Sequence, residues 1–250
     1  MTVTDFYDRL APFYHLIYHN WDASIGRQAV ALDGIIKDRW GKNTQTVLDV
    51  ACGIGTQSLG LATLGYTVTA SDLSSAAVAR AKHEAAARSL HVHFSVADMR
   101  EASTHHQRQF DVVIACDNSV PHLLTNADLL QAFQQFYACT RPGGGCLISV
   151  RDYDAEERGG VQVKPYGLRS EGQTRYLVFQ VWEFQGDIYD LAMYFVEDHG
   201  QAECLTHCMR THYYAVGTGT LISLMQQAGF EDVQRLDDRF YQPVIVGTRP

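Results

Sequence analysis

Apolar runs and helical spacings alternate along the chain up to residue 150. Short continuous apolar runs indicate buried parallel strands, and apolar residues three and four positions apart indicate helices between them. The predicted strands cover residues 47–50, 66–71, 91–96, 110–116 and 146–150. The predicted helices cover residues 56–65, 75–89 and 126–140, and the glycine-rich stretch 141–145 marks a break before the last strand. This alternation specifies an α/β fold with a doubly wound, mostly parallel sheet.

The two ends of the chain follow other patterns. Residues 1–45 are predicted to form a helical flap over the ligand, with an unusually aromatic first helix. Residues 152–214 change rhythm, and we expect an antiparallel insertion that serves as a lid on the acceptor side. Its three strand-like runs cover residues 174–184, 188–196 and 202–214. A helix over 218–229 and strands over 231–236 and 241–248 complete a core that comprises residues 46–151 and 215–250.

The strand, turn and helix over residues 47–56 carry the strongest chemical signal. Gly53 and Gly55 allow the backbone to turn sharply and to approach a ligand without a side chain in the way. A dinucleotide site requires a third glycine, but Ser58 occupies that position. Asp49 would repel a pyrophosphate. It is suited to order the turn and to bind, directly or through water, the ammonium of an amino-acid-like ligand.

Further polar residues follow the other strands, whose carboxyl ends form the binding edge of such sheets. Asp72 ends the second strand and is placed to accept both hydroxyls of a ribose, although it could equally cap the next helix. Asp98 and Met99 follow the third strand. Residues 116–118 follow the fourth strand, and Arg151 follows the fifth. The sequence therefore predicts one rim with glycine turns, acids, an amide and an arginine.

Several of these motifs resemble a known family. Asp-x-x-Cys-Gly-x-Gly at 49–55 is similar to motif I of the class I S-adenosylmethionine-dependent methyltransferases. Asn118-Ser-x-x-His122, Arg141-Pro-Gly-Gly144 and Arg151-x-Tyr-Asp154 resemble the glycine N-methyltransferase family and its bacterial small-molecule relatives. The resemblance implies a seven-stranded Rossmann-like methyltransferase sheet with an antiparallel strand insertion as lid. It also implies S-adenosyl-L-methionine as cofactor, with S-adenosylhomocysteine as its product.

The resemblance implies roles for individual residues. Asn118 would hold the amine region of an acceptor and Arg151 its carboxylate, because a guanidinium binds a carboxylate bidentately. His122 is the candidate base, if one is needed, and Tyr214 a candidate substrate contact. The expected cofactor-binding residues are Tyr14, Tyr18, Arg27, Asp49, Ala51, Gly53, Gly55, Asp72, Leu73, Asp98, Met99 and Cys116.

Composition narrows the function classes. The net charge of −8 and the lack of a basic cluster argue against a nucleic-acid partner. No apolar run approaches the roughly 20 residues of a membrane span, and no signal-peptide pattern opens the chain, so we expect a cytoplasmic protein without a membrane partner. Cys204, His207 and Cys208 lack a second pair that would close a tetrahedral set, so no metal is expected.

The function expected from the sequence is methylation of a small-molecule acceptor, most simply at the nitrogen of an amino acid or other amine, glycine- or sarcosine-like. One alternative is an oxygen-methylating enzyme on the same fold, in which His122 would serve as base. Another is a nucleotide-binding protein without methylation, NAD-dependent or regulatory, although Ser58 weighs against NAD. Association of the chain into a homo-oligomer is left open.

Overall fold

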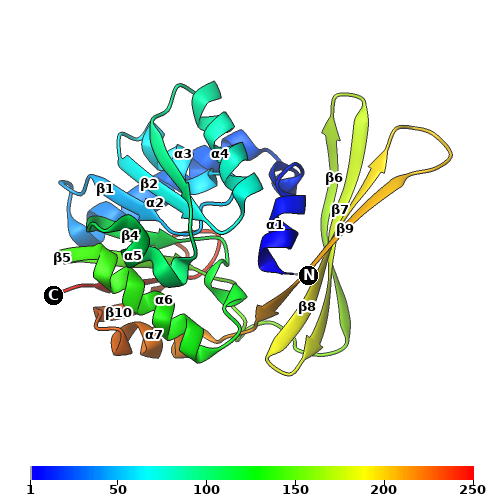
Figure 1. The fold of residues 1–250 in the computed structure, drawn as a ribbon. Coiled ribbons are helices and arrows are strands. Elements are labelled where there is room, and N and C mark those ends of the chain that lie inside the picture. The colour runs from blue at the N-terminus through cyan, green and yellow to red at the C-terminus, as the bar shows by residue number, and fades with distance from the viewer. Residues whose placement is uncertain (1) are drawn as a thin grey trace.

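The computed structural model describes residues 2–250, in which two separate sheets form. The larger sheet has seven strands in the order β10-β11-β5-β4-β1-β2-β3 (Figure 1). Six of its strands run in the same direction, whereas β11 runs antiparallel to both of its neighbours, β5 and β10. Its strands are β1 (Thr46–Asp49), β2 (Thr67–Asp72), β3 (Val92–Val96), β4 (Phe110–Ala115), β5 (Thr140–Ser149), β10 (Glu231–Leu236) and β11 (Val244–Thr248). The predicted doubly wound sheet of seven strands is confirmed.

Helices cover both faces of this sheet because its strand residues alternate between two apolar layers. Val47 packs with the layer of α2, α3 and α4, whereas the adjacent Leu48 packs with that of α5, α6 and α7. The same alternation separates Val112 from Val113 in β4. The helices are α1 (Val3–Leu10), α2 (Trp21–Trp40), α3 (Thr56–Thr63), α4 (Ser75–Ala87), α5 (Ala102–His106), α6 (Asn126–Cys139) and α7 (Thr218–Gln227), with 3-10 turns η1 (Tyr14–Ile17), η2 (Met99–Glu101) and η3 (Val120–His122).

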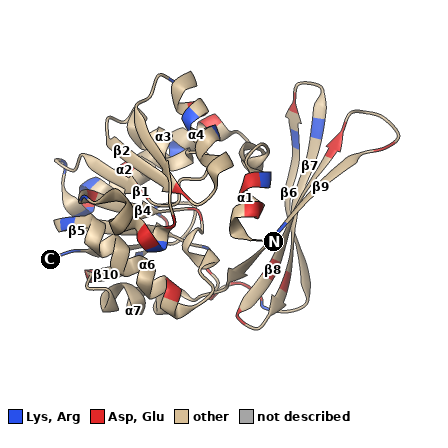
Figure 2. Ribbon diagram, viewed as in Figure 1, with Lys and Arg blue, Asp and Glu red and all other residues tan. Residues whose placement is uncertain are grey.

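The second sheet is antiparallel and stands apart from the first, with α1 between them (Figure 1). Its four strands, in order, are β6 (Val161–Glu171), β7 (Thr174–Gln185), β8 (Ile188–Asp198) and β9 (Leu205–Tyr214). Its apolar face packs against the N-terminal arm, residues 2–20, through Phe6, Leu10 and Leu16. The arm therefore separates the two sheets and contributes to the core of the smaller one. Acidic and basic residues are scattered over both sheets and the helices (Figure 2).

Three local expectations were wrong. Strand β6 was not predicted, because it is a largely exposed edge strand that contains Pro165, a residue tolerated only where no ladder donor is needed. Strand β5 begins at Thr140, so the stretch 141–145 does not break the chain; Gly145 is required there because a Cβ atom would overlap the Trp40 indole. The sequence also predicts a solvated pair, His105 and His106, in a polar loop, whereas His106 lies at the end of a short helix and burial lowers its pKa to about 4.

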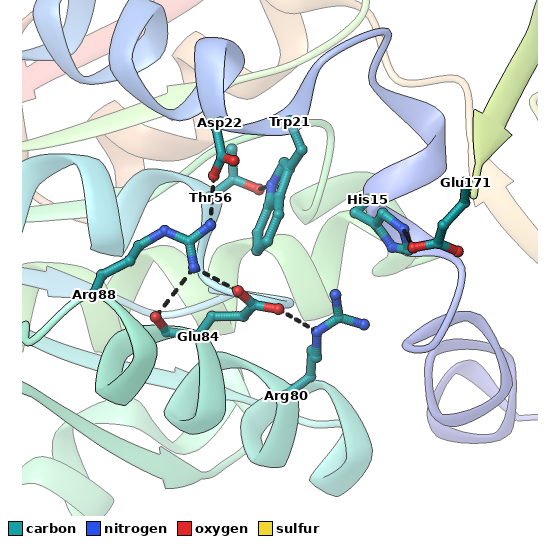
Figure 3. Close-up of polar contacts among 8 residues, drawn as sticks. All are labelled: His15, Trp21, Asp22, Thr56, Arg80, Glu84, Arg88 and Glu171. Carbon is teal, nitrogen blue, oxygen red and sulfur yellow. Dashed lines mark hydrogen bonds and ion pairs between the residues drawn. The ribbon is translucent and has the colours of Figure 1, made fainter.

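A polar network holds the start of α2 against the sheet (Figure 3). The indole Nε1 of Trp21 donates to Thr56 Oγ1 at 2.9 Å, at the first residue of α3. Arg88 pairs with Asp22 at 2.5 Å and also with Glu84, which accepts from Arg80 at 2.6 Å. These contacts tie α2 to α3 and α4. They hold the start of α2 next to the first residue of α3, which follows the glycine turn.

Candidate active site

A first cavity of about 310 Å³ lies at the carboxyl ends of β1, β2 and β3. Apolar side chains form its walls, and carboxylates stand at its rim. It is lined by Val3, Tyr7, Tyr14, Val50, Ala51, Gly53, Asp72, Leu73, Ala97, Asp98, Met99, Arg100, Ser119, His122, Leu123, Leu124 and Asp128. The structure thus brings together seven of the expected cofactor residues: Tyr14, Ala51, Gly53, Asp72, Leu73, Asp98 and Met99.

Asp49, the last residue of β1, stabilises the glycine turn from its buried side. Asp49 is buried and accepts hydrogen bonds from Ser58 Oγ at 2.7 Å and from the Ala51 amide at 3.3 Å. Burial raises its pKa to about 7. Ser58, at the position of the third glycine of dinucleotide motifs, is therefore the partner that satisfies Asp49. Asp49 orders the turn and does not line the cavity.

The two glycines of the turn have left-handed backbones, with φ of +52° at Gly53 and +96° at Gly55. The Gly53 amide donates to Asp72 Oδ2 at 2.8 Å, which fixes the turn to the end of β2. A Cβ atom at Gly53 would lie 3.1 Å from the Tyr14 ring, so the ring closes directly over the glycine. At Gly55 it would meet Leu59 at 3.2 Å, which shows that this glycine serves helix packing.

Asp72 keeps acceptor capacity toward the cavity. Its second oxygen, Oδ1, accepts from the Ser74 amide at 2.9 Å. Ser74, and not Asp72, caps α4, with its Oγ accepting from Ala77 N at 3.0 Å. The two backbone donors occupy only part of the lone pairs of a carboxylate. Burial raises the pKa of Asp72, as expected for an acid held away from water.

Asp98 is tied to a neighbouring arginine. It caps η2 through the Arg100 amide at 2.8 Å and pairs with the guanidinium at 2.7 Å, while Arg100 also reaches Asp128 at 2.9 Å. Partial burial raises the pKa of Asp98, but the hydrogen bonds from Arg100 outweigh burial and the net shift is downward. Asp98 is therefore an ionised acceptor at the far end of the cavity, beside the apolar Met99.

An aromatic group lies at the near end of the cavity, where α1, η3 and β9 meet. Tyr7 Oη lies 2.7 Å from His122 Nε2 and 3.4 Å from Tyr213 Oη. The rings of His122 and Tyr213 are 3.9 Å apart. Burial, with a smaller contribution from the charge of Arg151, lowers the pKa of His122 to about 3. The imidazole is therefore neutral, and Nε2 is already engaged.

Arg151 points toward the second sheet and lines a second cavity of about 630 Å³ together with residues of the arm and β6. Its Nη1 lies 3.1 Å from Tyr189 Oη, and its guanidinium lies over the rings of Trp182 and Tyr213 at 4.8 and 5.8 Å. No carboxylate among residues 2–250 forms an ion pair with it. The acids next to it in sequence are already engaged: Asp152 pairs with Arg235, and Asp154 accepts from the Thr218 amide at 3.0 Å.

Asn118 holds the loop after β4. Its Nδ2 donates to Tyr153 Oη at 2.7 Å, and its Oδ1 accepts from the Arg151 amide at 3.0 Å. The side chain is buried and lines neither cavity. Asn118 therefore positions the backbone of Arg151, whereas the resemblance had implied contact with the acceptor.

Other expected site residues lie elsewhere. Tyr18 lines the second cavity and donates to Asp117 Oδ2 at 2.9 Å. Arg27 is exposed and donates to Ser24 Oγ at 2.9 Å, away from the first cavity. Cys116 is buried beneath the loop. Tyr214 donates to Asn126 on the outer side of β9.

Sequence reasoning missed Tyr213, although a signal for it was present. Met209, Thr211 and Tyr213 are buried, whereas Arg210 and the other residues of opposite parity face outward. Side chains alternate along a strand, so the parity of β9 assigns Tyr213 and not Tyr214 to the inner face. Tyr7 carried no comparable signal, because only the packing of the arm on the core brings it to the cavity; Asp117 lies within residues 116–118 of the predicted rim, but no role was assigned to it.

Comparisons with known proteins agree with this geometry. A model of the methyltransferase domain matches residues 47–144. The glycine/sarcosine N-methyltransferase of Parasynechococcus marenigrum is 30% identical over 161 residues, which cover 64% of this chain and 53% of the relative. The chain thus spans about half the length of this relative.

Solved structures share the fold. Streptomyces venezuelae DesVI has a TM-score of 0.83 at 18% identity, covering 96% of this chain and 98% of that one. CalS10, an amino pentose methyltransferase from Micromonospora echinaspora solved with S-adenosylmethionine bound, has a TM-score of 0.78 at 20% identity, covering 91% and 92%. No helix described in residues 2–250 is long and apolar enough to cross a membrane. Residues 47–144 therefore resemble a methyltransferase domain, and the chain as a whole shares the fold of these solved structures.

Proposed function

We propose that this protein methylates the nitrogen of a small amine, most simply an amino acid, with S-adenosylmethionine as donor. The observation that carries the proposal is the state of His122. Its low pKa, about 3, and the contact of its Nε2 with Tyr7 make it a poor base for a hydroxyl near neutral pH. An amine needs no such base once it has lost its ammonium proton. Nitrogen methylation is therefore favoured over oxygen methylation.

The residues of the first cavity fit the donor. Gly53 permits close approach, Asp72 has free acceptor capacity for ribose hydroxyls, and Met99 offers an apolar wall for the adenine. When bound, S-adenosylmethionine supplies a methyl group that forms a C–N bond with the amine lone pair while the C–S electron pair returns to sulfur. The protein's own task is then alignment of the amine, which can contribute roughly 7–11 kcal/mol to lowering the barrier.

The second cavity suits the acceptor. Arg151 donates to Tyr189, and a hydrogen bond from it also opposes the rise that burial causes in the pKa of Tyr166, so its remaining N–H donors are available for a carboxylate. Tyr14 lies near both cavities: its ring lines the first, and the charge of Asp117, which lines the second, contributes to raising the pKa of Tyr14, after burial. An acceptor held by Arg151 would therefore present its amine toward the glycine turn.

We infer that the insertion, residues 152–214, acts as the lid on this second cavity. Tyr166 of β6 lines the cavity. Trp182 of β7 and Tyr189 of β8 surround the Arg151 guanidinium. Residues 1–45 would act as the flap and residues 46–151 with 215–250 as the donor-binding core. Because residues of the lid surround Arg151, substitutions in the lid strands would alter which acceptors bind and would affect donor binding less.

Label transfer tests the proposal directly. The protein is incubated with S-adenosylmethionine carrying a labelled methyl group and with panels of amino acids, amines, amino sugars and hydroxylated small molecules. We expect labelled N-methyl product from the amine panels, and binding of S-adenosylhomocysteine by calorimetry. Transfer only to hydroxyl groups would refute nitrogen methylation. Transfer only to amino sugars would refute the amino-acid assignment of Arg151, and failure to bind S-adenosylhomocysteine would refute the whole proposal.

A further inference from the structure

Two opposite charges face the second cavity without a partner of opposite charge. One is Arg151 at the end of β5, and the other is Asp117 in the loop after β4. We propose that Asp117 is a specificity-determining residue that accepts an N–H of the acceptor's ammonium while Arg151 binds its carboxylate, so that the site selects zwitterionic acceptors. Before methyl transfer the bound ammonium gives one proton to the Asp117 carboxylate, which leaves the nitrogen lone pair free to attack the methyl carbon. The inference rests on the proposed function, which places the acceptor in this cavity.

The backbone holds Asp117 in the left-handed region, which non-glycine residues rarely adopt and which Asp and Asn tolerate better than most. Its φ is +57°, and that of Asn118 is +63°, both in the left-handed region. Strand β5 enforces this turn: the Asp117 amide donates to Ser149 Oγ at 2.8 Å, and the Asn118 amide donates to Ser149 O at 2.9 Å. A glycine would adopt the turn without strain. Asp117 therefore has a more strained backbone than a glycine would have at this position, and its side chain lies at the cavity wall.

The other acidic residues that line the second cavity, unlike Asp117, form ion pairs. Glu156 pairs with Lys164 at 2.8 Å, and Asp152 pairs with Arg235. Among residues 2–250, Asp117 forms no ion pair; its carboxylate accepts from the neutral Tyr18 hydroxyl at 2.9 Å. Among the described acidic residues that line the second cavity, Asp117 alone forms no ion pair. The same cavity contains Arg151, which forms no ion pair within the described part of the chain either.

Both charges act on the same region of the cavity. Burial raises the pKa of Tyr166, the charge of Arg151 opposes that rise, and the charge of Asp117 adds to it. The two side chains thus lie near one tyrosine without forming an ion pair with each other. A partly desolvated charge is costly unless a partner compensates it. A zwitterion compensates both charges, whereas a simple amine or a simple carboxylate compensates only one.

The volume indicates acceptors larger than glycine. A cavity of about 630 Å³ has room for many waters, each of roughly 30 Å³ in the liquid. Its aromatic members, Tyr18, Tyr166 and Tyr241, provide surfaces for a side chain beyond the two charged groups. An amino acid with an apolar side chain would meet both the charges and the walls.

The test measures binding, so it does not depend on turnover. The protein is saturated with S-adenosylhomocysteine and titrated calorimetrically with two matched sets of probes: glycine, acetate and methylamine, and phenylalanine, 3-phenylpropanoate and 2-phenylethylamine. In at least one of the two sets, we expect the amino acid to bind at least ten-fold more tightly than the matched carboxylic acid and the matched amine. Asp117→Asn removes the charge with a residue that tolerates a left-handed backbone. It should weaken zwitterion binding at least ten-fold and leave the acid within about two-fold.

Two controls separate recognition from folding. Asp232→Asn makes the same change at an exposed aspartate that also has a left-handed backbone, with φ of +49°, and lines neither cavity, so it should leave all probe affinities unchanged. Asp117→Gly relieves the backbone strain, so it should fold at least as well as the wild type yet share the binding loss. Unchanged affinity for S-adenosylhomocysteine in each variant verifies the fold.

The outcomes distinguish this inference from the proposed function. Equal binding of zwitterion and acid, binding of none of the probes, or equal losses in Asp117→Asn and Asp232→Asn would overturn the role of Asp117. A protein that methylates amines without an Asp117-dependent preference contradicts only this inference. A protein that binds zwitterions through Asp117 but transfers label to no amine contradicts only the proposed function.

Discussion

Replacing Arg151 with lysine tests the acceptor site most sharply, because it keeps the charge and removes the planar guanidinium. In the structure the guanidinium has no carboxylate partner among residues 2–250, so no internal ion pair is lost on substitution. A lysine ammonium can donate to one carboxylate oxygen in the same direction but cannot reproduce the two parallel hydrogen bonds. Arg151→Lys should therefore impair recognition of a carboxylate and little else.

The magnitude follows from the bonds at stake. One charge-assisted hydrogen bond contributes roughly 1.5–3 kcal/mol, which corresponds to about a 10- to 150-fold loss in kcat/KM. The contact with Tyr189 and the stacking on Trp182 involve the protein in every state, so they affect stability and cancel in a comparison of two acceptors. The ratio of kcat/KM for an amino acid to that for its decarboxylated amine isolates the carboxylate contribution.

The assay is steady-state label transfer to a matched pair of acceptors, the amino acid and the amine that lacks its carboxylate, combined with calorimetry of S-adenosylhomocysteine. We expect the ratio of the two kcat/KM values to fall 10- to 150-fold while donor-product affinity stays within about two-fold. Equal losses for both acceptors would assign Arg151 a structural role. Weaker S-adenosylhomocysteine binding would assign it to the donor site, and an unchanged ratio would refute the carboxylate clamp.

Four further outcomes follow from the structure. Asp72→Asn should weaken S-adenosylhomocysteine binding by roughly 1.5–3 kcal/mol per ribose hydrogen bond, and unchanged calorimetric affinity in a folded variant would contradict the ribose role. Asp49 has a folded pKa of about 7 against an ordinary 3.8, so the native state binds the extra proton and the free energy of unfolding falls as pH rises from about 4 to 7. Asp49→Asn should flatten that slope, worth at most about 4 kcal/mol, in urea unfolding of the unliganded protein; a slope that persists would assign it to other groups. Tyr213→Ala should lower kcat/KM more than ten-fold while Tyr214→Phe changes it less than two-fold, and the reverse order in label transfer would contradict the parity of β9. Residues 152–214 expressed alone should show no cooperative thermal transition by circular dichroism, because the arm that covers their apolar face is missing; a cooperative melt would show that the insertion folds by itself.

The alternation of side chains along each strand was readable in the sequence and determined the larger sheet. Val47 and Leu48 reach opposite layers because successive strand residues point to opposite faces, whatever the rest of the chain does. The positions of Gly53 and Asp72 at strand ends were equally readable, because the carboxyl ends of parallel strands lie at one edge. These features depend on local covalent geometry and on short-range pattern.

Edge strands and distant contacts were not readable in this way. Strand β6 exposes much of its surface and contains Pro165, so neither burial nor propensity marks it; pairing with β7 alone makes it a strand. Tyr7 and His122, 2.7 Å apart, are separated by 115 residues. No spacing rule connects such a pair, because the contact exists only once the arm has packed between the two sheets.

The chemical state of the site was also decided by packing. Sequence identifies His122 as a candidate base, but its pKa of about 3 is a consequence of burial beneath the arm. Asp117 and Arg151 become neighbours of one cavity because β4 and β5 are adjacent in the sheet order, and each lacks a partner because the nearby charges are used elsewhere. Local pattern determined which chemical groups the chain carries. Desolvation and pairing, which arise only in the tertiary structure, decided which of these groups are left to act on a ligand.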